Sequence, residues 1–369
     1  MELVEREAPL ALLTAVAEQA RDGHGRAVLV SGPVAAGKSV LVHNFADHAL
    51  RRGMLPLSAL GSEDERHLTL GVMRQLVDDA PLDPEDRARA VALIEDGVRA
   101  ARTRGGEQMD AGIVHGLCTV LLELAESCPL YLAVDDVEQA DQASLTCLAY
   151  LARRLNNARV LAVFTHSGHG CDTEFRFGAD LLRQPNGHRV EVTPLSPAGV
   201  RQLTAQHLGE AIADERSADW HAYSGGNPLL VEALVRDHLG GGEAGPRYRE
   251  AVLSCLRRSC PDMVRALTGY LALGELDHLD GLLDLSPART TEAVHALIAG
   301  GLLTMDGFRH EAARDAVAGA VDADELAALH ARAAVLAHER GAGTAVIAGH
   351  LLHAGGPADG GVLEEPWAL

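Results

Sequence analysis

Lysine is almost missing from this chain. Of 32 basic residues, 31 are arginine, and Lys38 is the one lysine. Acidic residues outnumber basic ones, and the formal net charge is −20. Binding to nucleic-acid phosphates needs clustered basic residues, so the charge argues against a large nucleic-acid-binding surface on this chain. A composition this poor in lysine indicates that arginine replaces it wherever chemistry permits, so a retained lysine needs a reason.

Long apolar runs and paired cysteine motifs are also missing. Charges interrupt each apolar stretch, and the N-terminus lacks a secretion signal, so we expect no membrane span and a cytoplasmic location. The six cysteines show no C-x-x-C spacing, and most lie in apolar stretches. We expect them to be reduced thiols. A length of 369 residues predicts two or three domains.

The retained lysine lies in a Gly-rich segment. Residues 32–39 read Gly-Pro-Val-Ala-Ala-Gly-Lys-Ser, which matches the phosphate-binding loop pattern of Gly, four residues, Gly-Lys-Ser/Thr. An apolar run at 27–31 precedes it, and apolar residues at helical spacing follow, up to Gly53. A strand, a Gly-rich loop and a helix in this order direct backbone N–H groups at an anion. We predict that the nucleotide contacts Gly32, Pro33, Val34, Ala35, Ala36, Gly37, Lys38, Ser39 and Val40. Lys38 is expected on the β/γ-phosphates and Ser39 on Mg²⁺.

Two further apolar runs end in polar residues. Residues 130–134 are followed by Asp135 and Asp136, and residues 160–164 by Thr165 and His166. Helical stretches between the runs predict a parallel α/β sheet, with the ligand at the carboxyl ends of its strands. Adjacent carboxylates are costly to bury without a cation. We therefore predict that Asp135 holds Mg²⁺ and that Asp136 orients or deprotonates the attacking water. Thr165 is a candidate contact to the γ-phosphate or to that water.

The pattern becomes helical after residue 193. Ser196-Pro197 and Asn227-Pro228 are helix starts with a first-turn proline. A Gly-rich stretch at 240–246 is a linker, and residues 301–309 suit a hairpin with Asp306-Gly307 in its turn. We predict an α/β domain at 1–193, a helical lid at 194–245, a winged-helix-like domain at 246–321 and the start of a helical repeat at 322–369.

Several motifs together carry a family resemblance. They are Glu5-Arg6-Glu7, the loop at 32–39, Val134-Asp135-Asp136-Val137-Glu138, Gly225-Gly226-Asn227-Pro228 and Phe308-Arg309-His310-Glu311. With these motifs, the chain resembles the N-terminal part of the large ATP-binding regulators of the LuxR family, in the STAND branch of AAA-type ATPases. The resemblance implies a P-loop α/β domain, a helical lid, a winged-helix-like domain, bound ATP or ADP with Mg²⁺, and a possible homo-oligomer. It also implies nucleotide contacts by Arg6, Pro228 and His310.

Two departures from the family pattern bear on activity. His166 stands where such regulators place an arginine after the third strand, and an imidazole stabilises γ-phosphate charge less than a guanidinium does. The DNA-binding helix-turn-helix of such regulators is absent, and residues 250–320 carry six arginines against ten acidic residues. We expect contact with DNA only through a C-terminal domain that this chain lacks.

The function expected from the sequence is a switch module of a LuxR-type transcriptional regulator that binds ATP and hydrolyses it slowly. One alternative is a nucleotide-locked STAND scaffold without turnover. A second alternative is a small-molecule kinase of the P-loop class, which the Asn-Pro lid motif disfavours.

Overall fold

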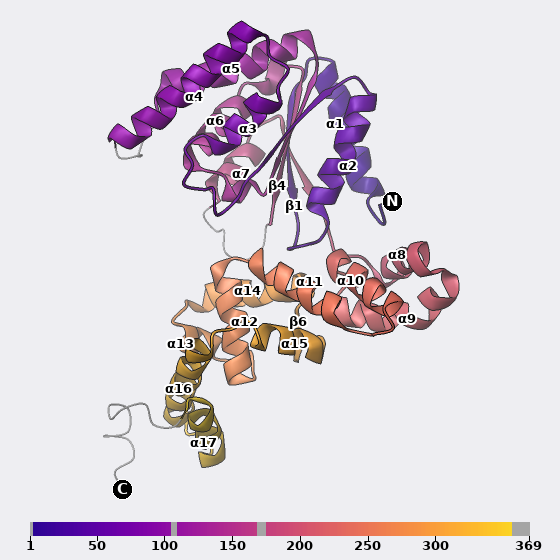
Figure 1. Ribbon diagram of the computed structural model, residues 1–369, viewed down its shortest axis with the longest axis vertical. Helices are drawn as coiled ribbons and strands as arrows, with labels where there is room; N and C mark the ends of the chain where they lie inside the picture. Colours follow the sequence, from indigo (N-terminus) through magenta and orange to yellow (C-terminus); the bar gives the residue numbers. More distant parts are fainter. Residues whose placement is uncertain (1–2, 105–108, 168–174, 356–369) are drawn as a thin grey trace. The chain divides into compact units, whose positions relative to one another are not determined.

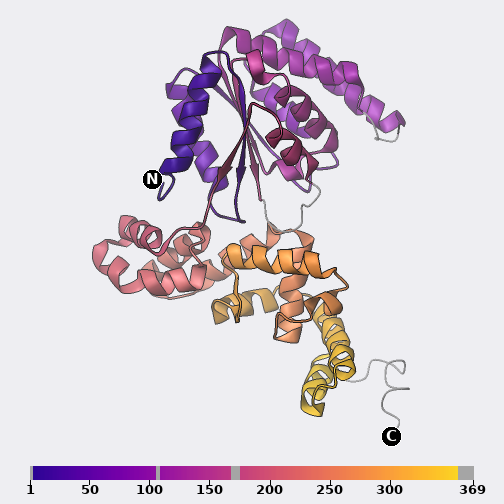
Figure 2. The ribbon, with the colours of Figure 1, turned by 180° about the vertical axis from the view of Figure 1, so that it is seen from behind.

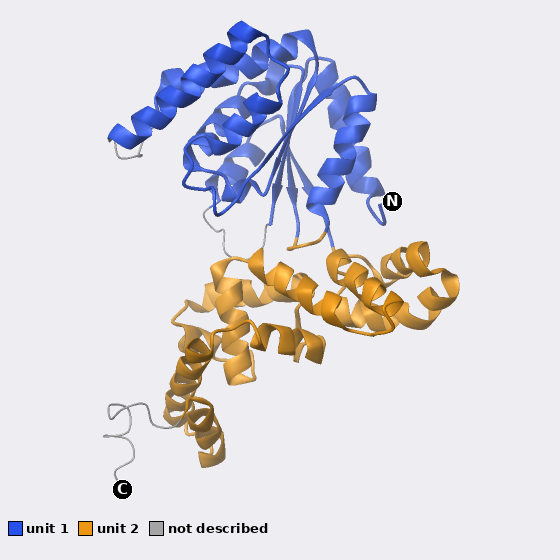
Figure 3. Ribbon diagram, viewed as in Figure 1, with its two compact units in different colours: residues 1–32, 37–168, 174–193 blue, residues 33–36, 169–173, 194–369 orange. Residues whose placement is uncertain are grey.

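The computed structural model describes residues 3–104, 109–167 and 175–355. These residues form two compact units (Figure 3). Of the described residues, the first unit takes 3–32, 37–167 and 175–193, and the second takes 33–36 and 194–355. The tip of the predicted phosphate loop is therefore packed with the second unit, although the chain on both sides of it belongs to the first.

A five-stranded parallel sheet forms the centre of the first unit, in the order β2-β3-β4-β1-β5. The predicted α/β class is confirmed. The strands are β1 (Arg26–Ser31), β2 (Leu55–Leu60), β3 (Leu130–Asp135), β4 (Val160–His166) and β5 (Gly187–Glu191). The three central strands are the apolar runs of the sequence, because both of their faces are covered. The edge strands β2 and β5 are partly exposed and lack such runs, so the sequence did not reveal them.

Helices cover both faces of this sheet (Figures 1 and 2). Helices α1 (Glu7–Arg21) and α2 (Lys38–Arg51) lie on one face, and α3 (Gly71–Asp79), α6 (Gln142–Ala152) and α7 (Arg176–Leu182) lie on the other. Helices α4 (Pro84–Arg104) and α5 (Ala111–Ser127) pack on each other and against α3 and α6. Two short 3-10 turns, Val137–Gln139 and Leu155–Asn157, follow β3 and α6.

One buried carboxylate starts two of these helices. Asp141 caps α6 by accepting a hydrogen bond from the backbone N–H of Ser144 at 2.8 Å. The same carboxylate accepts from the N–H groups of Leu70 at 2.8 Å and Val72 at 3.4 Å, at the start of α3. It therefore satisfies backbone donors that a helix N-terminus leaves without partners, and it ties α3 to α6.

The second unit begins with four helices, α8 (Pro197–Leu208), α9 (Glu210–Ser224), α10 (Pro228–Leu239) and α11 (Pro246–Arg257). The predicted caps are present: the Ser196 hydroxyl accepts from Gly199 N at 3.1 Å, and Asn227 Oδ1 accepts from Leu229 N at 3.0 Å. Hydrogen bonds hold the end of the predicted linker at 240–246 in place. The buried Asp237 carboxylate accepts them from three backbone N–H groups of residues 245–248.

A helix cluster with a short hairpin follows: α12 (Pro261–Leu273), α13 (Leu279–Leu283), α14 (Pro287–Ala299), β6 (Leu303–Thr304), β7 (Gly307–Phe308) and α15 (Glu311–Ala318). The hairpin confirms the sequence prediction, but its turn is displaced by one residue. Gly307 pairs with Thr304 instead of standing in the turn. A Cβ on Gly307 would lie 2.0 Å from the Tyr270 hydroxyl, and its φ is +127°, so glycine is needed there for packing and conformation. That the cluster is a winged-helix domain stays a prediction.

Two helices end the described chain, α16 (Ala323–Glu339) and α17 (Thr344–His353), and they pack on each other. Within the described residues, each helix is too short or too polar to cross a membrane. Cys118, Cys128, Cys147 and Cys255 are free thiols, as expected. Cys260 is disulfide-bonded, so the expectation of a reduced thiol is wrong for that residue.

Candidate nucleotide-binding site

The predicted phosphate loop joins β1 to α2 in a conformation that its glycines permit. Gly37 precedes the first residue of α2 and has a φ of +94°, where a side chain would be strained. Gly32 is needed for a different reason than the sequence suggested. A Cβ there would lie 2.2 Å from the backbone oxygen of Val192, so the segment after β5 can approach the loop only because Gly32 has no side chain. Ala35 also takes a left-handed conformation, with a φ of +59°.

Lys38 is folded into the loop. Its side chain is 5% exposed, and Nζ donates a hydrogen bond to the backbone oxygen of Gly32 at 3.0 Å. Lys38 is also the first residue of α2, whose opening N–H groups have no partners within the helix. The ammonium and these N–H groups form a positive site at a helix N-terminus, which suits a phosphate.

Thr165 connects the two predicted acids. It is fully buried at the end of β4, beside β3. Its hydroxyl donates to Asp135 Oδ1 and accepts from the backbone N–H of Asp136 at 2.8 Å. Asp136 has a φ of +46°, so the chain turns sharply between the two carboxylates. Thr165 thus holds the end of β3 in place, and the sequence, which suggested a contact to phosphate or water, did not predict this role.

Ser39 and Asp135, the two predicted Mg²⁺ ligands, line the same cavity of about 310 Å³ in the first unit. The set of oxygen donors, a hydroxyl and a carboxylate, is the one that Mg²⁺ prefers. The two residues are nearly one hundred positions apart in sequence, and the sheet brings them together. Both the phosphate-loop sequence and the position of these two residues in one cavity therefore suit a metal-bound nucleotide.

The same cavity includes residues that sequence reasoning missed. Gln75 of α3 lines it and clamps the end of β2: its Nε2 donates to Leu60 O at 3.1 Å, and its Oε1 accepts from Leu60 N at 2.8 Å. His43 and Ser58 also line it. The periodicity of α3 gives no hint of this role, because the partner of Gln75 is the backbone of an edge strand that the sequence did not reveal.

His166 is buried at the end of β4, stacked on Phe175 with ring centroids 4.4 Å apart and planes 3° apart. The following residue, Ser167, donates its backbone N–H to Glu138 Oε1 at 2.9 Å. These contacts fix the chain immediately after the strand. Whether the imidazole slows hydrolysis, as expected from its place in the sequence, stays a prediction.

Arg6 is buried and engaged with the backbone. Its guanidinium donates to Thr193 O at 2.9 Å and to Glu5 O at 3.0 Å. Burial lowers the pKa of Arg6, and the carboxylates of Glu5 and Glu7 oppose that effect. Arg6 therefore fixes the last residue of the first unit, and its contact with a nucleotide stays a prediction.

Pro228 and His310 belong to the second unit. Pro228 is the first residue of α10. His310 caps α15, where its Nδ1 accepts from Ala312 N at 3.0 Å, and its ring lies 4.5 Å from that of Tyr223. Because Nδ1 accepts, a neutral His310 carries its proton on Nε2. Nucleotide contacts by these two residues stay predictions.

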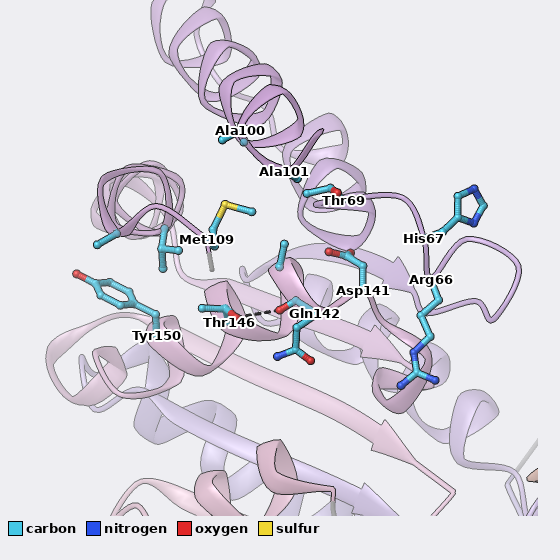
Figure 4. A pocket seen from close by; sticks show the side chains of 14 residues that line it. Arg66, His67, Thr69, Ala100, Ala101, Met109, Asp141, Gln142, Thr146 and Tyr150 are labelled. Atoms are coloured by element: carbon cyan, nitrogen blue, oxygen red, sulfur yellow. Dashed lines mark hydrogen bonds between the residues drawn. The ribbon is translucent and has the colours of Figure 1, made fainter. Parts of the chain in front are cut away.

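A larger cavity of about 510 Å³ lies elsewhere in the first unit, among α4, α5, α6 and the loop before α3 (Figure 4). Small side chains of α4, Ala100 and Ala101, leave the space, and Met109 and Tyr150 line it. The Thr146 hydroxyl at its wall donates to Gln142 O at 2.8 Å. The described residues that line this cavity include none of the predicted nucleotide contacts.

Residues 2–163 match the family model of the AAA ATPase domain. This part of the chain is similar to AAA ATPase domains. The matched residues include the phosphate loop with Lys38 and Ser39, and the two acids Asp135 and Asp136 at the end of β3. No curated protein sequence matches the chain.

Several solved structures are similar to the chain at low sequence identity. A STAND protein with a tetratricopeptide repeat sensor from Pyrococcus horikoshii is 16% identical, with a TM-score of 0.40 over 96% of this chain and 48% of that one. The ORC2 protein of Aeropyrum pernix is 13% identical, with a TM-score of 0.44 over 86% and 95% of the two chains. A RuvB variant from Thermotoga maritima is 13% identical, with a TM-score of 0.43 over 82% and 89%. The chain spans about half of the P. horikoshii protein.

Proposed function

We propose that the chain is an ATP-binding switch module of the STAND type that hydrolyses ATP slowly. The observation that carries this proposal is the cavity that contains both Ser39 and Asp135, at the start of the helix that follows the phosphate loop. A buried ammonium, helix N–H groups and two hard oxygen ligands in one place suit a nucleotide triphosphate with Mg²⁺.

The roles of the side chains follow from their positions. Lys38 neutralises phosphate charge beside the loop backbone, and Ser39 and Asp135 supply oxygen ligands for Mg²⁺. The metal, when bound, neutralises charge that develops on the phosphates. Asp136 orients the attacking water or accepts its proton, and Thr165 holds both acids at the end of β3.

The regulatory part of the proposal is supported by the sequence resemblance. The segments Gly225-Gly226-Asn227-Pro228 and Phe308-Arg309-His310-Glu311 resemble motifs of LuxR-type regulators, in which a separate C-terminal domain contacts DNA. On this proposal the chain supplies the nucleotide-dependent switch, and a separate domain of the regulator contacts DNA. The charge of −20 supports this division.

A titration with a fluorescent ATP analogue and Mg²⁺ tests the proposal. Lys38→Ala removes a buried, charge-assisted contact worth about 2–5 kcal/mol, so we expect an affinity at least about 30-fold weaker. Arg99→Ala removes an exposed cation on α4 and serves as the matched control, with unchanged affinity expected. Equal affinities of the wild type and the Lys38→Ala variant would refute the nucleotide site.

Phosphate release from the same proteins separates a switch with turnover from a locked scaffold. We expect slow release from the wild type and none from Asp136→Asn, which keeps the volume of the side chain but cannot accept a proton. Release at the wild-type rate from the Asp136→Asn variant would exclude a catalytic role for Asp136. Tight ATP binding without release from the wild type would favour the scaffold.

A further inference from the structure

Asn227 lies at the meeting point of three segments of the second unit that are distant in sequence. Its side chain is 1% exposed. Around it are the tip of the phosphate loop, the start of α10 and the turn that leads from α14 into the hairpin. All three segments belong to the second unit, because residues 33–36 pack there.

The side-chain amide of Asn227 is fully used. Its Nδ2 donates to Gly300 O at 2.7 Å and to Val34 O at 3.2 Å. Its Oδ1 accepts from Leu229 N at 3.0 Å and so caps α10. An amide group is planar and has two N–H donors, so the positions of Val34 O and Gly300 O depend on each other through one rigid group.

The turn at residues 300–301 packs closely against the segment that carries Asn227. Gly301 has a φ of +80°, and a Cβ there would lie 2.0 Å from Ser224 O. Gly226, with a φ of +77°, is equally close to Leu195 O. The backbone is therefore in close contact with other backbone segments on both sides of Asn227. Segments packed this closely move together between discrete arrangements.

We propose that Asn227 is a positioning residue that transmits the state of the phosphate loop to the hairpin formed by β6 and β7. This inference rests on the proposed nucleotide binding. When the loop N–H groups hold phosphate, the peptide group that carries Val34 O adopts the orientation that this contact requires. Asn227 relays that orientation to Gly300 O, three residues before β6 begins. A bound nucleotide thereby favours one arrangement of the hairpin.

The chemistry of the residue supports a bridging role in addition to capping. Aspartate, serine and asparagine cap helices about equally well. Only asparagine among them offers two N–H donors, and the structure places a carbonyl oxygen at each of them. A cap alone would not require this residue type.

The substitution Asn227→Asp separates the two roles, because aspartate keeps the cap on α10 but cannot donate to Val34 or Gly300. Its matched control is Asp322→Asn, the reverse exchange at the cap of α16, where Asp322 accepts from Asp324 N and Glu325 N. Asn227→Ser is a second variant without the added charge. It keeps a capping oxygen and is used if Asn227→Asp does not fold.

Hydrogen–deuterium exchange of the full chain, with and without Mg²⁺·ATP, provides the readout at residues 300–309. We expect ATP to change exchange there in the wild type and in Asp322→Asn. We expect the change to be lost in Asn227→Asp and Asn227→Ser, although both variants still bind the fluorescent ATP analogue.

Three results would overturn the inference. They are an ATP-dependent change that persists in the Asn227 variants, an equal loss of that change in Asp322→Asn, and a wild type that binds ATP without a change at 300–309. If the wild type does not bind ATP at all, the proposed function fails instead, and the analogue titration reports that separately.

Discussion

Replacing Thr165 tests whether this residue organises the acids or contacts the nucleotide. Thr165→Val removes the hydroxyl and keeps nearly the same shape, whereas Thr165→Ser keeps the hydroxyl and removes one methyl group. In the structure the hydroxyl donates to Asp135 and accepts from Asp136 N, and the side chain is fully buried. Thr165→Val should therefore disturb the geometry of the two acids, whereas Thr165→Ser should keep it.

The magnitudes follow from these two bonds. In Thr165→Val the Asp136 N–H loses its acceptor in a buried place, which costs about 1–3 kcal/mol. Asp135 loses one hydrogen-bond donor, but its partly exposed carboxylate can accept a hydrogen bond from water instead. We therefore expect Thr165→Val to lower the free energy of unfolding by about 2–3 kcal/mol in total. In Thr165→Ser the lost methyl group costs about 1 kcal/mol. The valine variant should thus be less stable than the serine variant by about 1–2 kcal/mol.

Two assays check the prediction. Hydrogen exchange at β4 and at the Asp136 amide measures the opening free energy of this part of the first unit. Titration with Mg²⁺ at fixed ATP measures the metal dependence of binding, and loss of a group that orients a metal ligand costs about 10–100-fold in metal affinity. We expect that loss for valine and near wild-type behaviour for serine.

The reasoning would be refuted if the two variants were equally stable and bound Mg²⁺ alike, because the hydroxyl would then be irrelevant to Asp135. A third outcome would restore the role predicted from the sequence. If Thr165→Val left metal affinity and stability intact but abolished phosphate release, a contact of Thr165 with phosphate or water would be favoured.

Two further predictions concern stability. Gly32→Ala would bring a Cβ to within 2.2 Å of a backbone oxygen, so we expect a lower melting temperature and weaker ATP binding, whereas Gly349→Ala, with open space around its Cβ, should be neutral or stabilising. Equal melting temperatures would contradict the packing argument. His330 and His350 approach each other with Nδ1 atoms 3.2 Å apart, and burial first, then the neighbouring histidines, lowers the pKa of both. Because these pKa values are lower in the folded protein, the unfolded chain binds more protons, and stability falls as the pH drops below about 6.5. Hydrogen exchange of α16 and α17 at two pH values should show this loss, and replacing both histidines with glutamine should remove it.

The sequence predicted the central sheet well because its strands are buried on both faces. The apolar runs before Gly32, Asp135 and Thr165 became β1, β3 and β4, and the motifs after them lie at their carboxyl ends. Local chemistry also predicted the starts of α8 and α10, since Ser196 and Asn227 act on N–H groups two or three residues away. In these cases the information lies within one segment of the chain.

The contacts that organise the site depend on partners far away in sequence, and the sequence did not predict them. Thr165 of β4 donates to Asp135 of the neighbouring strand β3, and Gln75 hydrogen-bonds to the backbone of the edge strand β2. The need for glycine at position 32 has a similar origin. The backbone oxygen that leaves no room for a Cβ there belongs to Val192, which is distant in sequence. No periodicity or spacing within one segment encodes such pairs, so only the assembled sheet reveals them.

The structure also separates the two adjacent acids, which the sequence could only place at the same edge of the sheet. Asp135 is the last residue of β3 and lines the cavity with Ser39. Asp136 follows in a left-handed conformation, and its backbone N–H donates to the Thr165 hydroxyl. We propose that a metal ion that binds Ser39 also binds Asp135, which lines the same cavity, and that Asp136 acts on the water. We expect the proposed division of roles to depend on the hydroxyl of Thr165, because that one group contacts both residues.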